Sequence, residues 1–232
     1  MKVKLLRHTA NAELLVGTAA FTSTKSGSPS ENIEKIDLET AKRVIKQVTA
    51  YGHASVIEHA SFTFSIEGVS RAMTHELVRH RIASYTQQSQ RYVAYDTSEN
   101  YVVPKSIIEN QDAKRMFDET LTKVSETYQK LLKMGVPKED ARFVLPNAAK
   151  TNIIVTMNAR ELRHFFNLRC CARAQWEIRE VATEMLRQAK KATPALFENA
   201  GPSCTELGYC PEGKMKLKDC EVTEIEKRFQ NL

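Results

Sequence analysis

The sequence contains no apolar run that approaches the roughly 20 residues needed to cross a membrane as a helix. Residues 1–21 loosely imitate a secretion signal, but Glu13 interrupts their apolar stretch and no clear cleavage site follows, which indicates mature sequence. Glycine and proline are scarce, at 8 and 7 of 232 residues, and this excludes fibrous and disordered classes. We therefore expect a cytoplasmic protein with no membrane partner. Its length favours a single domain over residues 1–232, with a C-terminal extension from about residue 200.

Cysteine is limited to five residues, an odd number in a chain long enough to fold without disulfides, so reduced thiols are expected. Cys204, Cys210 and Cys220 could ligate zinc, but their spacing lacks a close CxxC pair. The histidines form no HExxH or similar ligand pattern. We therefore expect no metal site.

Several motifs that bind phosphate or carry a nucleophile are also absent. There is no GxSxG, no P-loop and no GxGxxG, so phosphate binding must come from side chains. The net charge is only +6, from 34 Lys and Arg against 28 Asp and Glu. This balance suits anionic small molecules at least as well as a nucleic-acid backbone.

Hydrophobic periodicity predicts both helices and strands. Apolar residues recur at helical spacing from Leu38 to Tyr51, and Gly52 follows where a left-handed residue would end that helix. Further helices are expected at residues 70–80, 117–134, 158–169 and 174–189, strands at 61–66 and 151–157, and capping boxes at 55–58 and 158–161. We predict an α+β fold in which helices flank a central sheet.

The densest polar cluster is RHRIASYTQQSQRY, at residues 79–92. Arg79, His80 and Arg81 alone have a simple explanation, because cations in the last turn of a helix offset its negative end. The next residues favour a ligand, since six hydroxyl or amide side chains add donors and acceptors but no acid that would neutralise the arginines. They are Ser84, Thr86, Gln87, Gln88, Ser89 and Gln90. Because the arginine fork matches phosphate bidentately, the cluster predicts a phosphorylated ligand such as a nucleotide.

A second cluster is MNARELRHFFNLR, at residues 157–169, on a helix that begins beside a strand. Arg160 and His164 are four residues apart and share one helix face. That face is either a solvated surface or, with an imidazole between the arginines, the lining of a cofactor site.

The first cluster resembles the RHRx7S signature of the flavin-dependent thymidylate synthases, the ThyX family, with Arg79-His-Arg followed after seven residues by Ser89. Four other segments resemble that family in the same order: GHASVIEH (52–59), ARFVLP (141–146), TMNARELRHFFNLR (156–169) and AQWEIR (174–179). The resemblance covers residues 52–179 and continues faintly at AGPSC (200–204), whereas the first fifty residues match poorly.

This resemblance implies a homotetramer with active sites at subunit interfaces. It also implies a methyltransferase of nucleotide biosynthesis, which reductively methylates dUMP to dTMP. Methylenetetrahydrofolate would supply the carbon, NADPH (or NADH in its place) the reducing equivalents, and a bound FAD would carry the hydride. No nucleic acid is implied as a partner.

The resemblance also assigns candidate site residues. Arg169 would be catalytic, beside the uracil ring, and His53, near flavin and folate, could move protons. The dUMP set would be Glu76, Arg79, Gln87, Ser89, Gln90, Arg91, Arg142 and Arg169. The FAD set would be Ser55, Arg79, His80, Arg81, Gln87, Asn158, Arg160 and His164. Ser89 is expected to be a ligand and not a nucleophile, because only His80 nearby could deprotonate it.

Three departures from the family pattern matter, and one of them is Arg173, at a position where some relatives carry histidine beside the flavin. Glu76 stands where the family often has glutamine, and this carboxylate could orient Arg79 instead of contacting dUMP. TAAFTST, at residues 18–24, lacks the arginine expected at an N-terminal flavin contact, so those contacts stay unassigned.

Two rival readings remain. In a basic RNA-binding module, the arginines would grip phosphates while Tyr85, Tyr92 and Tyr95 stack on bases. In a flavin-binding homologue, the fold would be kept without synthase activity. The RNA module is disfavoured because the chain has no RRM or KH signature and its cations are interleaved with apolar residues.

Overall fold

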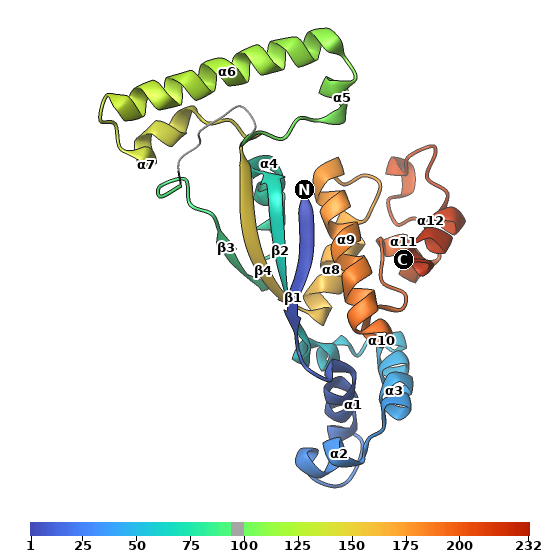
Figure 1. The fold of residues 1–232 in the computed structure, drawn as a ribbon. Coiled ribbons are helices and arrows are strands. Elements are labelled where there is room, and N and C mark those ends of the chain that lie inside the picture. Colours follow the sequence, from blue (N-terminus) through green and yellow to red (C-terminus); the bar gives the residue numbers. More distant parts are fainter. Residues whose placement is uncertain (94–99) are drawn as a thin grey trace. The chain divides into compact units, whose positions relative to one another are not determined.

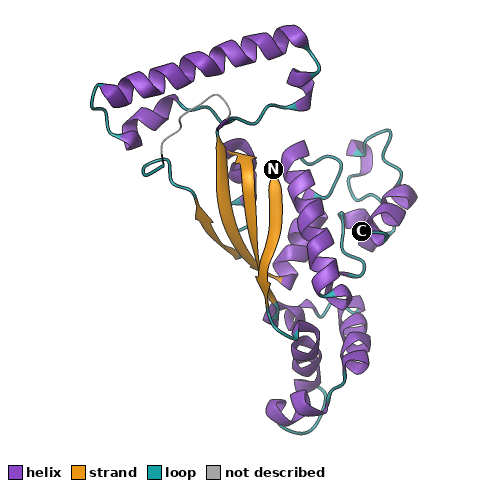
Figure 2. Cartoon of the chain, viewed as in Figure 1, coloured by secondary structure: helices purple, strands orange, loops and turns teal. Residues whose placement is uncertain are grey.

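The computed structural model describes residues 1–93 and 100–232, so Tyr95 lies outside the described residues. Four strands form one sheet in the order β1-β2-β4-β3 (Figure 1), and the other regular elements are helices (Figure 2). The strands are Lys2–His8 (β1), Ser61–Ser70 (β2), Ala83–Gln87 (β3) and Lys150–Asn158 (β4). The predicted mixture of helices and a central sheet is confirmed. In the described ranges, no helix combines the length and apolar character that a membrane span requires.

Strand β2 lies between β1 and β4, and its side chains alternate between buried and more exposed positions, as predicted for a half-buried strand. Its pairing with β4 is antiparallel: Ala159 N donates to Ala60 O (2.8 Å) at one end, and Arg71 N donates to Ala149 O (3.0 Å) at the other. The predicted strands at 61–66 and 151–157 are therefore confirmed, and both are longer than their apolar alternation indicated.

Ser70 ends β2 and caps helix α4 (Arg71–Leu77), since its Oγ accepts a hydrogen bond from Met73 N at 3.0 Å. The helix ends at Leu77, before the RHR tripeptide begins. The prediction of a helix that continues to residue 80 is therefore wrong, and so is the explanation of residues 79–81 as cations in a last helical turn. The chain leaves the helix at Val78 and runs towards β3.

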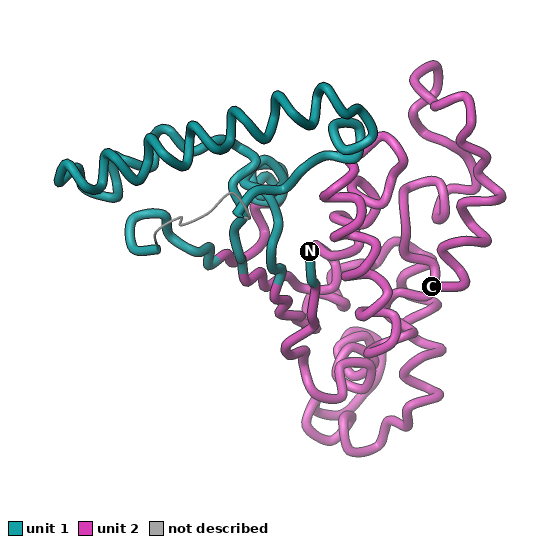
Figure 3. The backbone as a smooth tube through the Cα atoms, turned by 45° about the horizontal axis from the view of Figure 1, so that its top comes forward, with its two compact units in different colours: residues 1–2, 66–79, 86–153 teal, residues 3–65, 80–85, 154–232 magenta. Residues whose placement is uncertain are grey.

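The chain divides into two compact units (Figure 3). Unit 1 contains residues 1–2, 66–79 and 86–153, and unit 2 contains residues 3–65, 80–85 and 154–232. The four strands pass through both units.

The helices of unit 1 pack around Leu121 and Tyr128, both buried on α6. This long amphipathic helix is confirmed, and Gly135 follows it with the left-handed φ of 84° that glycine adopts readily. Besides α4, the elements of unit 1 are α5 (Lys105–Ile108), α6 (Gln111–Lys133), α7 (Lys138–Ala141) and the 3-10 turn η3 (Arg142–Val144).

The helices of unit 2 include the two predicted near residues 158–169 and 174–189. Helix α9 lies alongside β1 (Figure 1), where the Gln188 amide accepts from Leu5 N (2.6 Å) and donates to Val3 O (2.9 Å). The elements are α1 (Ala12–Thr22), α2 (Pro29–Lys35), α3 (Leu38–Ala50), η1 (Ala54–His59), α8 (Ala159–Arg169), α9 (Trp176–Ala192), α10 (Pro194–Phe197), α11 (Ser203–Leu207), η4 (Gly213–Met215) and α12 (Val222–Gln230).

Helices α1 and α3 approach closely because Gly17 has no side chain. A Cβ added to Gly17 would lie 2.7 Å from the Cβ of Ala41, closer than real contacts allow. Gly52 has a left-handed φ of 78° after α3, as predicted, and the chain then enters η1 at Ala54. The predicted capping box at residues 55–58 is wrong, because η1 begins one residue before Ser55.

Candidate functional site

The RHR tripeptide turns its imidazole inward and both its guanidinium groups outward. His80 is only 4 % exposed, whereas Arg79 and Arg81 are exposed. The Tyr85 hydroxyl donates to His80 O at 2.8 Å and so fixes the backbone at this point. The tripeptide therefore supplies one buried imidazole and two surface cations.

His80 joins Arg169 and Glu161 in one hydrogen-bonded array inside unit 2. Arg169 Nε donates to His80 Nε2 at 3.1 Å, and His80 Nδ1 lies 3.3 Å from Glu161 Oε1. An arginine Nε always carries hydrogen, so His80 Nε2 must be unprotonated. The single proton of a neutral imidazole is then on Nδ1, the ring nitrogen that lies 3.3 Å from Glu161 Oε1.

The surroundings keep this imidazole neutral. Burial, with the positive charge of Arg169 and the nearby His164, lowers the pKa of His80 to about 4. Burial raises the pKa of Glu161, which is 7 % exposed. Phe165 packs edge-on against the His80 ring, with centroids 5.0 Å apart. His80 is therefore a fixed acceptor for the Arg169 side chain.

The array depends on the start of α8. Asn158 caps the helix as predicted, because its Oδ1 accepts from Glu161 N at 2.9 Å. This bond sets Glu161 in the first turn, where its side chain faces His80. The outer face of α8 carries Arg160, which pairs with Glu58, and His164, whose ring centroid is 5.7 Å from that of His80. The predicted second cluster thus has both an exposed and a buried side.

A second group of predicted residues lies in unit 1. Gln87, at the end of β3, donates from Nε2 to the hydroxyls of Thr74 (3.0 Å) and Thr151 (3.4 Å). Glu76 lies half-buried one turn before the exposed Arg79. Gln87 is therefore held in place by α4 and β4.

Ser89 begins a turn in which its Oγ accepts from Arg91 N at 3.2 Å. Arg91 Nε lies 2.7 Å from Glu139 Oε2, and Arg142 Nε donates to Glu139 O at 3.0 Å. The structure thus brings Arg91 and Arg142 to the same residue. It also corrects the expectation that no acid neutralises the arginines, because the fold brings Glu139 from helix α7. Gln90 is half-buried in the same turn.

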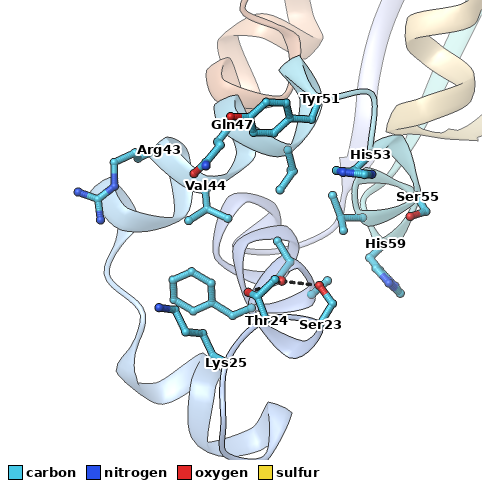
Figure 4. A pocket seen from close by; sticks show the side chains of 15 residues that line it. Ser23, Thr24, Lys25, Arg43, Val44, Gln47, Tyr51, His53, Ser55 and His59 are labelled. Carbon is cyan, nitrogen blue, oxygen red and sulfur yellow. Dashed lines mark hydrogen bonds between the residues drawn. The ribbon is translucent and has the colours of Figure 1, made fainter.

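Unit 2 also contains a pocket of about 850 Å³ between α1, α3 and η1 (Figure 4). His53 and Ser55, both predicted as site residues, line it together with His59. Lys25 also lines it, and its Nζ lies 5.9 Å from the centroid of the Phe21 ring. Of the described residues around the pocket, none is acidic. The pocket therefore combines apolar and aromatic walls with a positive potential.

Several residues that line this pocket were not predicted from the sequence, among them Lys25, Arg43, Gln47 and Tyr51. Arg43 and Gln47 on α3, and Tyr51 just after its end, are spaced four apart, next to the half-buried Val44 and Val48. This polar stripe beside an apolar one could have indicated a pocket lining. The same pattern is equally typical of a solvated helix face, and only the contact of α1 with α3 distinguishes the two.

Comparison with known proteins gives a consistent result. Residues 4–195 match the family described as "Thymidylate synthase complementing protein". The chain is 49 % identical over 234 residues to a flavin-dependent thymidylate synthase of Geobacter sulfurreducens, covering 100 % of this chain and 99 % of that protein. It is 44 % identical over 227 residues to one of Pyrococcus abyssi, covering 95 % and 93 %.

Two solved structures are similar in fold. One is a UMP/dUMP methylase, PolB, from Streptomyces cacaoi bound with 5-Br dUMP, with a TM-score of 0.73, 27 % identity, and coverage of 85 % of this chain and 93 % of that one. The other is the flavin-dependent thymidylate synthase ThyX from Helicobacter pylori complexed with FAD and dUMP. Its TM-score is 0.71 at 24 % identity, with coverage of 87 % and 100 %.

Proposed function

The chain belongs to the flavin-dependent thymidylate synthases, and from this premise we propose that it reductively methylates dUMP to dTMP. In the net reaction, dUMP, methylenetetrahydrofolate, NADPH and a proton give dTMP, tetrahydrofolate and NADP⁺. The observation that carries the proposal is the array of Arg169, His80 and Glu161. The array holds the Arg169 guanidinium in one orientation at the end of α8, and the sequence there resembles the family's catalytic segment.

Arg169 would act on the pyrimidine. A fixed cation beside the uracil ring favours loss of the N3 proton and concentrates electron density on C5, the carbon to be methylated. Because His80 stays neutral and accepts from Arg169 Nε, the guanidinium need not reorganise as that charge develops. The array therefore supplies preorganisation, which is where most electrostatic catalysis originates.

The described residues fit FAD, which joins planar aromatic rings to a negatively charged pyrophosphate. The pocket of about 850 Å³ between α1, α3 and η1 is large enough for part of such a ligand, and its lining has aromatic side chains and cations without acids. Ser55 and His53 would contact the cofactor there, with His53, whose side chain is exposed, moving protons to solvent. When bound, FAD supplies the hydride-transfer chemistry that no side chain offers.

The other proposed FAD contacts are Arg79, Arg81, Gln87, Asn158, Arg160 and His164. His80 is reassigned, because both of its ring nitrogens are engaged within the protein. We propose that His80 positions Arg169 and does not contact the cofactor through a ring hydrogen bond.

The phosphate and sugar of dUMP would be held by Arg79, Gln87, Ser89, Gln90, Arg91 and Arg142. Arg91 already pairs with Glu139, but both side chains are about half exposed, and such surface pairs contribute only about 0.2–1 kcal/mol. A phosphate dianion can therefore replace Glu139 at Arg91. We propose that Glu76 either orients Arg79 or contacts dUMP directly.

A homotetramer with shared active sites is also proposed. It is supported by the exposure of Arg79 and Arg81, which a ligand or a second subunit would cover. Light scattering of the purified protein should give a mass close to four chains. A mass of one chain that persists with FAD and dUMP bound would rule the assembly out.

The reaction is tested with dUMP tritiated at C5. Incubated with the protein, FAD, NADPH and methylenetetrahydrofolate, it should release tritium to water as dTMP forms, and omission of any one component should abolish product. Tritium that stays on C5 although flavin is retained would instead favour a flavin-binding homologue without synthase activity. A protein that retains no flavin but binds RNA with a steep dependence on salt would favour the RNA-binding module.

A further inference from the structure

Residues 206–220, between α11 and α12, have almost no core of their own. Every residue of this segment is exposed except Cys210 and Cys220. Large apolar side chains such as Tyr209 and Met215 are also exposed, at 60 % and 62 %. Two partly exposed ion pairs, Arg163 with Glu206 and Arg173 with Glu212, tether the segment, and such pairs add little stability. Cys210 and Cys220 are its two residues that are not exposed.

Four of the five cysteines line one cavity of about 330 Å³. Cys204 is on α11, Cys210 and Cys220 are in the following segment, and Cys171 comes from the end of α8. None of them is in a disulfide. The fold therefore gathers thiols that lie up to 49 positions apart, from 171 to 220, into one place.

Four thiols around one cavity are the donor set of a soft cation. As thiols they are weak hydrogen-bonding groups and small apolar ones, too few to hold the 13 exposed residues of the segment in place. A soft cation would convert them into strong ligands.

We propose that Cys171, Cys204, Cys210 and Cys220 bind one soft divalent metal ion, with Zn²⁺ as the best match to four thiolates. Binding would release the four thiol protons to solvent and form four metal–sulfur bonds of about 2.3 Å. Small segments that lack a hydrophobic core are commonly held in this way. The site is structural. Because Arg169 also lines this cavity, the test below measures metal content and not synthase activity.

The four sulfurs surround the cavity without meeting at one point. In the described ranges, no three or more His, Cys, Asp or Glu side chains lie close enough together to hold an ion. Binding therefore requires the segment with Cys210 and Cys220 to move inward. Gly208 and Gly213, with left-handed φ values of 72° and 53°, flank Cys210, and as glycines they give the backbone on both sides of it the conformational freedom that such a movement needs.

Metal content tests the proposal directly. The full-length protein, expressed with Zn²⁺ and purified without chelator, should contain about one Zn²⁺ per chain by mass spectrometry of the metal. After exchange with Co²⁺ it should show the sulfur-to-cobalt charge-transfer band and the strong visible bands of a tetrahedral tetrathiolate. Cys210→Ser and Cys220→Ser should each lose the bound metal and weaken the bands. Cys170→Ser should keep both, because Cys170 is the one cysteine that does not line the cavity.

The proposal is overturned by two results. One is a folded wild-type protein without stoichiometric metal that shows no cobalt–thiolate band, whether its five thiols titrate as free or some are oxidised to disulfide. The other is equal metal content in wild type, Cys210→Ser and Cys220→Ser. Neither readout depends on synthase activity, so failure here leaves the proposed reaction untouched.

Discussion

Replacing Arg169 with alanine should lower kcat for tritium release from dUMP by about 10²- to 10³-fold, the usual loss when one preorganised donor to a developing negative charge is removed. The guanidinium is held by His80 Nε2 at 3.1 Å, so it is already oriented before the substrate arrives. Since dUMP binding would rest mainly on the arginines of unit 1, the KM for dUMP should change much less than kcat. Steady-state tritium release at several dUMP concentrations separates the two parameters.

Two further variants make this result specific. Arg169→Lys keeps the charge but lacks the Nε–H that reaches His80, so it should recover only a small part of the lost rate. Arg187→Ala, on the exposed side of α9 where Arg187 pairs with Glu184, removes a surface arginine far from the array and should leave kcat unchanged. If Arg169→Ala retained more than about a tenth of the wild-type kcat, Arg169 would not be the catalytic residue.

Elements with one buried face were predictable from the sequence. Strand β2 and helices α3 and α6 each alternate or repeat with the period of their structure, because one side meets the core and the other meets water. The caps at Ser70 and Asn158 were likewise visible as local chemistry. Such signals need no knowledge of distant contacts.

Other elements carry no such pattern. Helix α1 has apolar residues all round it, so it presents no stripe, and its place depends on the contact of Gly17 with Ala41 on α3. Strand β3 carries mostly polar side chains and lies at the edge of the sheet. Strand β1 is only half-buried and is recognised by its pairing with β2 and its bonds to Gln188. Their structure is set by partners far along the chain.

The same distinction holds for the candidate site. Residue type and spacing pointed to His80 and Arg169, but the contact between them joins positions 80 and 169 and could not be read from either cluster. Glu139 beside Arg91 was missed because it lies on α7, far along the chain from Arg91. Lys25 was missed because it lies in a stretch with the composition of a loop. Local sequence indicates which side chains are unusual, whereas tertiary contacts decide which of them are neutralised.

Replacing Glu161 with leucine should lower kcat by about 10- to 100-fold while the KM for dUMP stays within about threefold, because Glu161 acts only through His80. Without the carboxylate, His80 Nδ1–H loses its acceptor at 3.3 Å. The ring can then carry its proton on Nε2, where it would face the Arg169 Nε–H as donor against donor. The ¹⁵N chemical shifts of the His80 ring should report this change of tautomer, which simple loosening of the fold would not produce.

Glutamine at position 161 separates positioning from charge. Its side-chain oxygen can still accept from His80 Nδ1, so Glu161→Gln should keep the wild-type tautomer and a kcat within about fivefold of wild type. Equal losses in the leucine and glutamine variants would show that the negative charge matters and not the hydrogen bond. Unchanged kcat in both would mean that Arg169 is held by its other contacts, and the array would then have no part in catalysis. The hydrogen-bond explanation requires a large loss of kcat in Glu161→Leu and a small loss in Glu161→Gln. The reason is that only an oxygen acceptor at position 161 fixes which nitrogen of His80 faces Arg169.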